Sequence, residues 1–208
     1  MKYPFFIICL FSLLSCNYNS EKLSNEILKN GNDVFNNQSS KNLTDSITPK
    51  KETTPVINIE NTIVQPNLYL TMKDETNFEG EKQIKLKLIL NNLMFILKKN
   101  HLEPFGPPVS WITKQSNLFV IEGGIPLERK LPVDEPCTMY KKTKRCKAAV
   151  AHFFGKRSLV SVTFDSLSTW VKENHKTAIG NPWVVYVDDP HVMKDPNFLQ
   201  TDVYLEFK

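Results

Sequence analysis

The sequence predicts an α+β domain in which an antiparallel sheet is backed by two helices and built from two similar halves. Two observations lead to this prediction: the chain contains an internal repeat, and each copy shows the same order of helical and strand-like hydrophobic patterns. The chain has 208 residues, of which 41% are hydrophobic and 23% charged. That is enough for one domain and a tail, and it excludes a wholly disordered chain or a polytopic membrane protein.

The repeat is clearest in two eleven-residue blocks, Lys98–Pro108 and Lys172–Pro182. Lys, Asn, His, Gly and the final Pro coincide between the blocks. Each block follows an apolar stripe with steps of 4, 3 and 4 residues, formed by Leu86, Leu90, Leu93 and Leu97 in the first copy and by Val160, Phe164, Leu167 and Val171 in the second. Such a stripe is typical of an amphipathic helix that ends at the Asn-His pair, before a Gly-x-Pro turn.

Strands flank each helix, so that each half reads strand–helix–strand–strand. The expected strands are Leu68–Met72, Val109–Thr113 and Leu118–Pro126 in the first half, and Cys146–Phe154, Trp183–Val187 and Leu199–Phe207 in the second. A hairpin strand at Cys137–Lys141 would link the halves. A six-residue insertion around Asp188–His191 widens the repeat offset, so that Glu122 matches Asp202.

The first sixteen residues have the form of an export signal. Lys2 precedes an apolar run from Phe5 to Leu14, which is too short to span a bilayer. The ending Leu-Leu-Ser-Cys16 resembles a bacterial lipobox, which implies removal of residues 1–15 and a lipid on Cys16; an ordinary signal peptide is the alternative. Asn17 in place of Asp favours the outer membrane, so we expect a lipid-anchored protein that faces the periplasm.

Residues 16–66 are rich in Asn, Ser, Thr, Lys and Glu, and their few hydrophobic residues follow no period. We expect a polar tether, because such a segment buries too little surface to offset the entropy of ordering it. The alternative is that the segment packs on the domain. The folded domain is then predicted to cover residues 67–208.

Two cysteines remain in the predicted domain, Cys137 and Cys146. If the Lys141-Lys142 pair forms the centre of a hairpin, the two thiols face each other and a disulfide can form in an oxidising compartment. The alternative is a pair of thiols on offset strands. The lysine-rich turn itself is expected to be solvated.

The C-terminal half resembles the GyrI-like, or AraC-type effector-binding, domain family. The resemblance covers about residues 67–208 and rests on short motifs that fall in family order. They are the aromatic-Gly step at Phe154-Gly155, the Gly180-x-Pro182 turn, Tyr186-x-x-Asp189-Pro190, and the final strand Thr201-Asp202-Val203-Tyr204. The resemblance implies two modules related by a pseudo-twofold axis. The related SOUL haem-binding fold is a more distant likeness, and the sequence lacks a haem attachment motif, so we expect no cofactor.

The resemblance also implies that the cleft between the modules binds a small organic molecule, often cationic or aromatic, above an acidic residue. Asp202 stands where the family has Glu, and Glu122 is its counterpart in the first half. Strand alternation places Asp202, Tyr204 and Glu206 on one face of the last strand and the apolar residues on the other. The expected ligand-binding residues are Asp202, Glu122, Tyr204, Tyr186, Trp183, Trp111 and Phe119. The alternative is that the aromatic residues belong to the core and that Asp202 is a solvated edge residue.

Two other functions stay open. Some relatives hydrolyse reactive small molecules with cleft carboxylates, which would require Glu122 and Asp202 in one pocket; a protein-interaction lipoprotein would instead expose an apolar sheet edge. We expect no metal, because His152 and His191 lack partners at metal-site spacing, and we assign His101 and His175 to helix capping. The net charge of +4 and the absence of a recognisable helix-turn-helix pattern argue against a nucleic-acid partner. The oligomeric state is not predicted.

Overall fold

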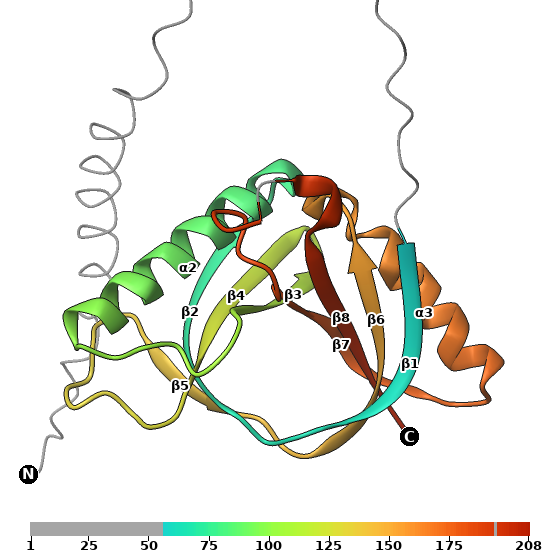
Figure 1. Cartoon of the computed structure of the whole chain (residues 1–208), viewed down its shortest axis with the longest axis horizontal. Coiled ribbons are helices and arrows are strands. Elements are labelled where there is room, and N and C mark those ends of the chain that lie inside the picture. The colour runs from blue at the N-terminus through green and yellow to red at the C-terminus, as the bar shows by residue number, and fades with distance from the viewer. Residues whose placement is uncertain (1–55, 194) are drawn as a thin grey trace, which may run out of the picture. The chain divides into compact units, whose positions relative to one another are not determined.

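The computed structural model describes residues 56–193 and 195–208, and within them eight strands form one antiparallel sheet with two longer helices on one side (Figure 1). The predicted signal, residues 1–15, and Cys16 lie outside the described residues. The elements in chain order are β1 (Val56–Val64), β2 (Leu68–Thr76), α2 (Lys82–Lys99), β3 (Val109–Gln115), β4 (Leu118–Leu127), β5 (Met139–Lys142), β6 (Cys146–Phe154), α3 (Val162–Glu173), β7 (Ala178–Val185) and β8 (Gln200–Phe207).

The strand order confirms the duplicated architecture. It runs β1-β6-β8-β7-β3-β4-β2-β5, so each module contributes three adjacent strands and the modules meet where β3 pairs with β7. One further strand precedes each module, and the two are exchanged: β1 leads into β2 but pairs with β6, while β5 leads into β6 but pairs with β2. The sheet therefore interlocks the two halves.

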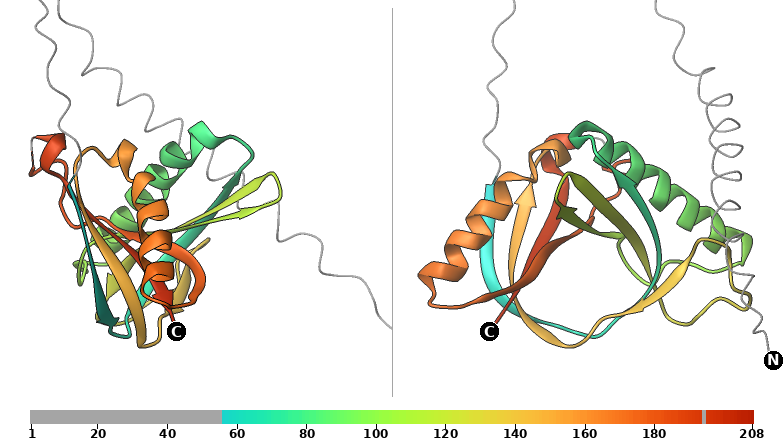
Figure 2. Two further views of the ribbon diagram at one scale, coloured as in Figure 1. Left: turned by 90° about the vertical axis from the view of Figure 1, so that its right-hand side faces the viewer. Right: turned by 180° about the vertical axis from the view of Figure 1, so that it is seen from behind.

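The short links that follow β1 and β5 force the sheet to curve. Only residues 65–67 join β1 to β2, and only residues 143–145 join β5 to β6. Each link spans at most about 15 Å, although six strand spacings of a flat sheet measure about 29 Å. The sheet consequently bends until its two edges approach each other at one end, and both helices lie on the outer side of the bend (Figures 1 and 2).

The helices cover the outer face of the sheet with the predicted apolar stripes. Helix α2 buries Leu86, Leu93 and Leu97 against β2 and β4, with Ile89 added and Leu90 only partly buried. Helix α3 buries Leu167 and Val171 against β6 and β8, where Val203, Leu205 and Phe207 meet it as expected. Two hydrophobic clusters result, one under each helix.

The ends of the two helices match in detail. The side-chain amides of Asn100 and Asn174 each donate a hydrogen bond to the backbone carbonyl oxygen four residues earlier in the helix. His101 and His175 then adopt the same left-handed conformation, both with φ of 54°. The histidines end the helices through this backbone conformation, the role that glycine usually fills, and the repeat extends to this detail.

The domain starts earlier than the sequence predicts. Strand β1 lies inside the predicted tether, residues 16–66, and pairs with β6 over nine residues from Val56 to Val64. Ile57 and Ile59 pack on the α3 cluster. The prediction is wrong here because an edge strand is stabilised largely by backbone hydrogen bonds to a strand that is distant in the sequence. Its own hydrophobic pattern can therefore be weak.

The predicted hairpin between the halves is also wrong, and with it the Cys137–Cys146 disulfide. Strand β5 pairs with β2 and not with β6, so residues 143–145 cross between opposite regions of the sheet instead of closing a hairpin. Cys146 has a free thiol in the structure.

The last difference concerns β7, which begins at Ala178 rather than at Trp183. The expected Gly180-x-Pro182 turn is an irregularity within this strand, where the register against β8 shifts between Ile179 and Trp183. Gly180 has a φ of 69°, which lets the chain make the bulge without steric strain.

Candidate functional site

The inner face of the sheet, meaning the face turned away from α2 and α3, carries the candidate site. Residues that are paired across strands share a face, so the register defines one continuous row across both modules: Glu60, Val150, Tyr204, Trp183, Trp111, Glu122 and Lys73. The two tryptophans are paired where β3 meets β7, at the centre of the row. Aromatic side chains thus mark the boundary between the modules, and charged groups lie on both sides of it.

In the first module, a buried carboxylate and an aromatic ring contact the same ammonium group. Lys141 of β5 places its Nζ 2.7 Å from Glu122 Oε2 and 3.6 Å from the centre of the Trp111 ring. Tyr69 meets Trp111 edge-on at a centroid distance of 5.3 Å. Glu122 is only 9% exposed, and Lys73 Nζ lies 4.0 Å from the same oxygen. The site therefore already binds a cation, which belongs to the protein itself.

In the second module, Asp202 is paired with a histidine. Asp202 Oδ1 lies 2.8 Å from His152 Nδ1 and accepts a hydrogen bond from Gln200 Nε2 at 3.0 Å. His152 Nε2 lies 3.6 Å from Glu60 Oε1. Burial by itself would lower the pKa of His152, but the hydrogen bonds and charges of Asp202 and Glu60 outweigh it, and the pKa is raised. Protonated His152 compensates the charge of Asp202.

The aromatic rings of the second module are stacked beside this acid. Trp183 and Tyr204 lie nearly parallel at a centroid distance of 5.3 Å. Burial, followed by the charge of Asp202, raises the pKa of Tyr204 to about 12, so the phenol is neutral at physiological pH. Burial also raises the pKa of Tyr69. These rings offer polarised π-faces and hydroxyl groups without adding charge.

The two acids occupy equivalent positions, as the repeat predicts. Glu122 pairs with Trp111 in β3, and Asp202 pairs with the corresponding residue of β7, Val185. Each acid also faces a basic residue on the first strand of its module, Lys73 for Glu122 and His152 for Asp202. The pseudo-twofold relation therefore includes an acid–base pair in each half.

Five of the seven predicted ligand-binding residues share the inner face: Asp202, Glu122, Tyr204, Trp183 and Trp111. Tyr186 and Phe119 do not, because their places in the alternation turn them to the outer face. Tyr186 packs against both hydrophobic clusters, and its hydroxyl lies 2.9 Å from Ser110 Oγ. Phe119 is buried beneath the ammonium groups of Lys82 and Lys114.

Sequence reasoning missed three residues of the inner face: Tyr69, Lys141 and His152. Tyr69 lies in the expected strand Leu68–Met72, and His152 in the expected strand Cys146–Phe154. Alternation within those strands could have placed both residues opposite the apolar side. No local signal marks Lys141, because its contact with Glu122 depends on the pairing of β5 with β2 and of β2 with β4.

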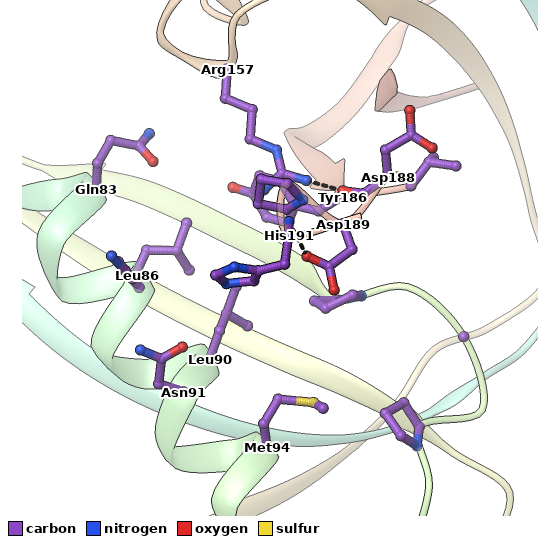
Figure 3. Close-up of a pocket in the computed structure, with 16 residues that line it drawn as sticks. Gln83, Leu86, Leu90, Asn91, Met94, Arg157, Tyr186, Asp188, Asp189 and His191 are labelled. Carbon is purple, nitrogen blue, oxygen red and sulfur yellow. Dashed lines mark hydrogen bonds between the residues drawn. The ribbon is translucent and has the colours of Figure 1, made fainter. Parts of the chain in front are cut away.

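A separate cavity of about 700 Å³ opens on the outer side, between α2 and the segment that follows β7. Leu86, Leu90 and Met94 of α2 form one wall, and the inserted segment 187–191 forms the other (Figure 3). Arg157 donates a hydrogen bond to the backbone oxygen of Asp188 and lies over the Tyr186 ring. Of the predicted ligand-binding residues, only Tyr186 lines this cavity.

The positions of the acidic residues bear on two other chemistries considered above, hydrolysis by two carboxylates and metal binding. Glu122 and Asp202 lie on one face but on opposite sides of the tryptophan pair, and each already contacts a base. Within the described residues, no group of three or more His, Cys, Asp or Glu side chains could hold a metal ion. The inner face as it stands is suited to binding by charge and aromatic contact.

Comparison with solved structures identifies the fold. The crystal structure of the EcmrR C-terminal domain matches with a TM-score of 0.62 and 14% identity, covering 74% of this chain and 98% of that domain. The EcmrR–DNA complex matches with a TM-score of 0.63 and 14% identity over 73% of this chain and 57% of EcmrR, so this chain spans little more than half the length of that protein.

A third match is the structure of SAV2435 bound to tetraphenylphosphonium, with a TM-score of 0.50 and 7% identity over 73% of this chain and 94% of the other. No family model matches the sequence. No curated protein matches it either. The described part of this chain therefore shares the fold of the EcmrR C-terminal domain, consistent with the GyrI-like effector-binding fold that the motifs predict.

Proposed function

We propose that this domain binds small aromatic cations on the inner face of its sheet. The observation that carries the proposal is the position of the Lys141 ammonium, which lies 3.6 Å from the Trp111 ring centre and 2.7 Å from Glu122. An aromatic face and a buried carboxylate that hold one cation provide the chemistry to hold another. Each cation–π contact contributes about 0.5–2 kcal/mol, with the higher values at desolvated sites.

The second module extends the same chemistry. Trp183 and Tyr204 present a stacked aromatic surface next to Asp202, which is 7% exposed. A flat or propeller-shaped aromatic cation could contact the tryptophan pair with its rings while its charge is shared between the two acids. A neutral ligand would gain the aromatic contacts but not the charge pairing, so the proposal includes a preference for cations.

The structural comparisons support this choice of ligand class. SAV2435, which has a similar fold, has been solved bound to tetraphenylphosphonium, an aromatic cation. At 7% identity the likeness concerns the fold alone. The residues proposed for the present chain are therefore argued from its own inner face.

The test is titration of the full chain with tetraphenylphosphonium, with binding measured by calorimetry and by tryptophan fluorescence. We expect Glu122→Gln and Asp202→Asn each to weaken binding at least about fivefold, because a buried carboxylate that pairs with the cation is lost. Asp165→Asn, which removes an exposed carboxylate on α3, serves as the control. Equal affinity in all three variants and the wild type would exclude both acids from the site.

We further propose that the domain is anchored to the bacterial cell envelope through a lipid on Cys16 and faces the periplasm. The proposal is based on the Leu-Leu-Ser-Cys16 motif of the sequence. No helix in residues 56–193 or 195–208 is long and apolar enough to cross a membrane. Metabolic labelling with palmitate tests the anchor. Label that persists in Cys16→Ser would refute it, and label that is lost in this variant but kept in Cys9→Ser would support it.

A further inference from the structure

The position of Lys141 has a consequence for ligand binding. Its ammonium contacts both groups that the proposed function assigns to the ligand, Glu122 and the Trp111 ring. A ligand cation that used the same carboxylate and the same ring face would have to replace this ammonium. The first module is therefore occupied by an internal competitor in the absence of ligand.

The surroundings of Lys141 allow such a replacement. Strand β5 has four residues and lies at the edge of the sheet, where β2 is its strand partner. The Lys141 side chain is 33% exposed, so its flexible stem can carry the ammonium into solvent while the strand stays paired. An ammonium regains full hydration there, which makes retreat less costly than it would be from an enclosed site.

We infer that Lys141 is a specificity-determining residue that competes with the ligand for Glu122 and Trp111, so that only cations with larger aromatic surfaces displace it. This inference rests on the proposed function. Simple ammonium ions offer no more than Lys141 already provides, and they lack the advantage of being tethered to the site. A neutral aromatic molecule cannot replace the charge beside Glu122. An aromatic cation supplies the same charge and adds contacts with Tyr69, Trp183 and Tyr204.

The variant Lys141→Met tests this competition, because methionine keeps an unbranched apolar stem and removes the charge. We expect Lys141→Met to bind tetraphenylphosphonium between about 2-fold and 30-fold more tightly than the wild type, the range of one cation–π contact. Lys142→Met is the matched control, since Lys142 is the exposed neighbour on the same strand. Its affinity should equal that of the wild type. Equal or weaker binding by Lys141→Met would overturn the inference while the wild type still binds.

A second measurement follows the lysine directly and starts without any ligand. Acetylation of the full chain with an N-hydroxysuccinimide ester, read by peptide mass spectrometry, should modify Lys141 more slowly than Lys142, and Glu122→Gln should reduce that difference. Tetraphenylphosphonium should then accelerate modification of Lys141, because the ligand exposes the ammonium. Slower modification of Lys141 on ligand addition would overturn the inference.

The two failures are distinguishable. If tetraphenylphosphonium binds neither the wild type nor Lys141→Met, the proposed function fails, whatever the labelling shows. If the wild type binds and Lys141 reacts as fast as Lys142 without ligand, the competition fails and the proposed function stands.

Discussion

Two adjacent glycines in β4 face opposite sides of the sheet and allow the packing and the site to be perturbed separately. A Cβ atom added at Gly123 would lie 2.5 Å from Ile89 Cγ2, 3.2 Å from Leu90 Cδ2 and 3.3 Å from Leu86 Cδ1, all on α2. Ile89 is branched at Cβ, so its Cγ2 cannot swing aside alone. Gly123→Ala should therefore displace α2 and destabilise the fold by about 1–3 kcal/mol. For a domain of this size, that lowers Tm by between about 2 and 12 °C.

The neighbouring position should behave differently. A Cβ atom at Gly124 would lie 3.0 Å from Trp111 Cζ3, 3.1 Å from Thr71 Cγ2 and 3.3 Å from Val109 Cγ2, on the inner face. These contacts require shifts of a few tenths of an ångström, and the ring end of Trp111 can tilt. Alanine also restricts the unfolded chain, which offsets about 0.4–1 kcal/mol of the strain. We expect Gly124→Ala to change stability by less than about 1 kcal/mol but to move Trp111.

The assay combines thermal unfolding by circular dichroism with tryptophan emission and tetraphenylphosphonium titration. Gly123→Ala should lower Tm and leave the emission spectrum and the affinity unchanged; Gly124→Ala should shift the emission and weaken binding with little change in Tm. Gly80→Ala, where an added Cβ has no neighbour within 4 Å, is the control. A Gly123→Ala protein as stable as the Gly80→Ala protein would refute the close packing of α2 on β4. Unchanged emission in Gly124→Ala would refute the placement of Trp111.

Two further predictions concern histidines. Because the pKa of His152 is raised in the folded protein, its ion pair with Asp202 should stabilise the fold fully below about pH 6.5, and this stabilisation should be lost as pH rises through the folded pKa. The Tm difference between wild type and His152→Gln should therefore be larger at pH 5.5 than at pH 8.5. A difference that does not change with pH would contradict the pairing. His101 and His175 share a φ of 54°, which glycine adopts without strain. His101→Gly and His175→Gly should therefore each increase the free energy of unfolding by about 0.5–1 kcal/mol and raise Tm. A lower Tm in both variants would mean that the imidazoles themselves stabilise the helix ends.

Much of the candidate site could be predicted from local patterns. Asp202 and Tyr204 share a face because side chains alternate along β8, and Val203 and Leu205 are buried against α3 for the same reason. The repeat correctly made Glu122 the counterpart of Asp202. The same alternation, applied to Tyr186 and Phe119, would have assigned them to the outer face; grouping by residue type instead placed them with the other aromatic residues.

The partners of the two acids could not be predicted in this way. Lys141 reaches Glu122 through two strand pairings that join distant segments, β5 with β2 and β2 with β4. The sequence around Lys141 is rich in lysine and reads as a solvated turn, which is what it would be if β5 formed a hairpin with β6. The outer cavity likewise depends on the inserted segment 187–191 lying against α2 of the other module.

By itself, the sequence determined the two amphipathic helices, the faces of most strands and the duplication, because periodicity is a local property of the chain. The tertiary structure alone decided which strands are neighbours. The three-residue links after β1 and β5 bend the sheet and exchange its edge strands between the modules. The exchange places β5 beside β2, two strands from β4, and so brings the Lys141 ammonium onto Glu122 and Trp111. Local patterns could not predict this contact, because pairing between distant segments is set by the geometry of the whole sheet.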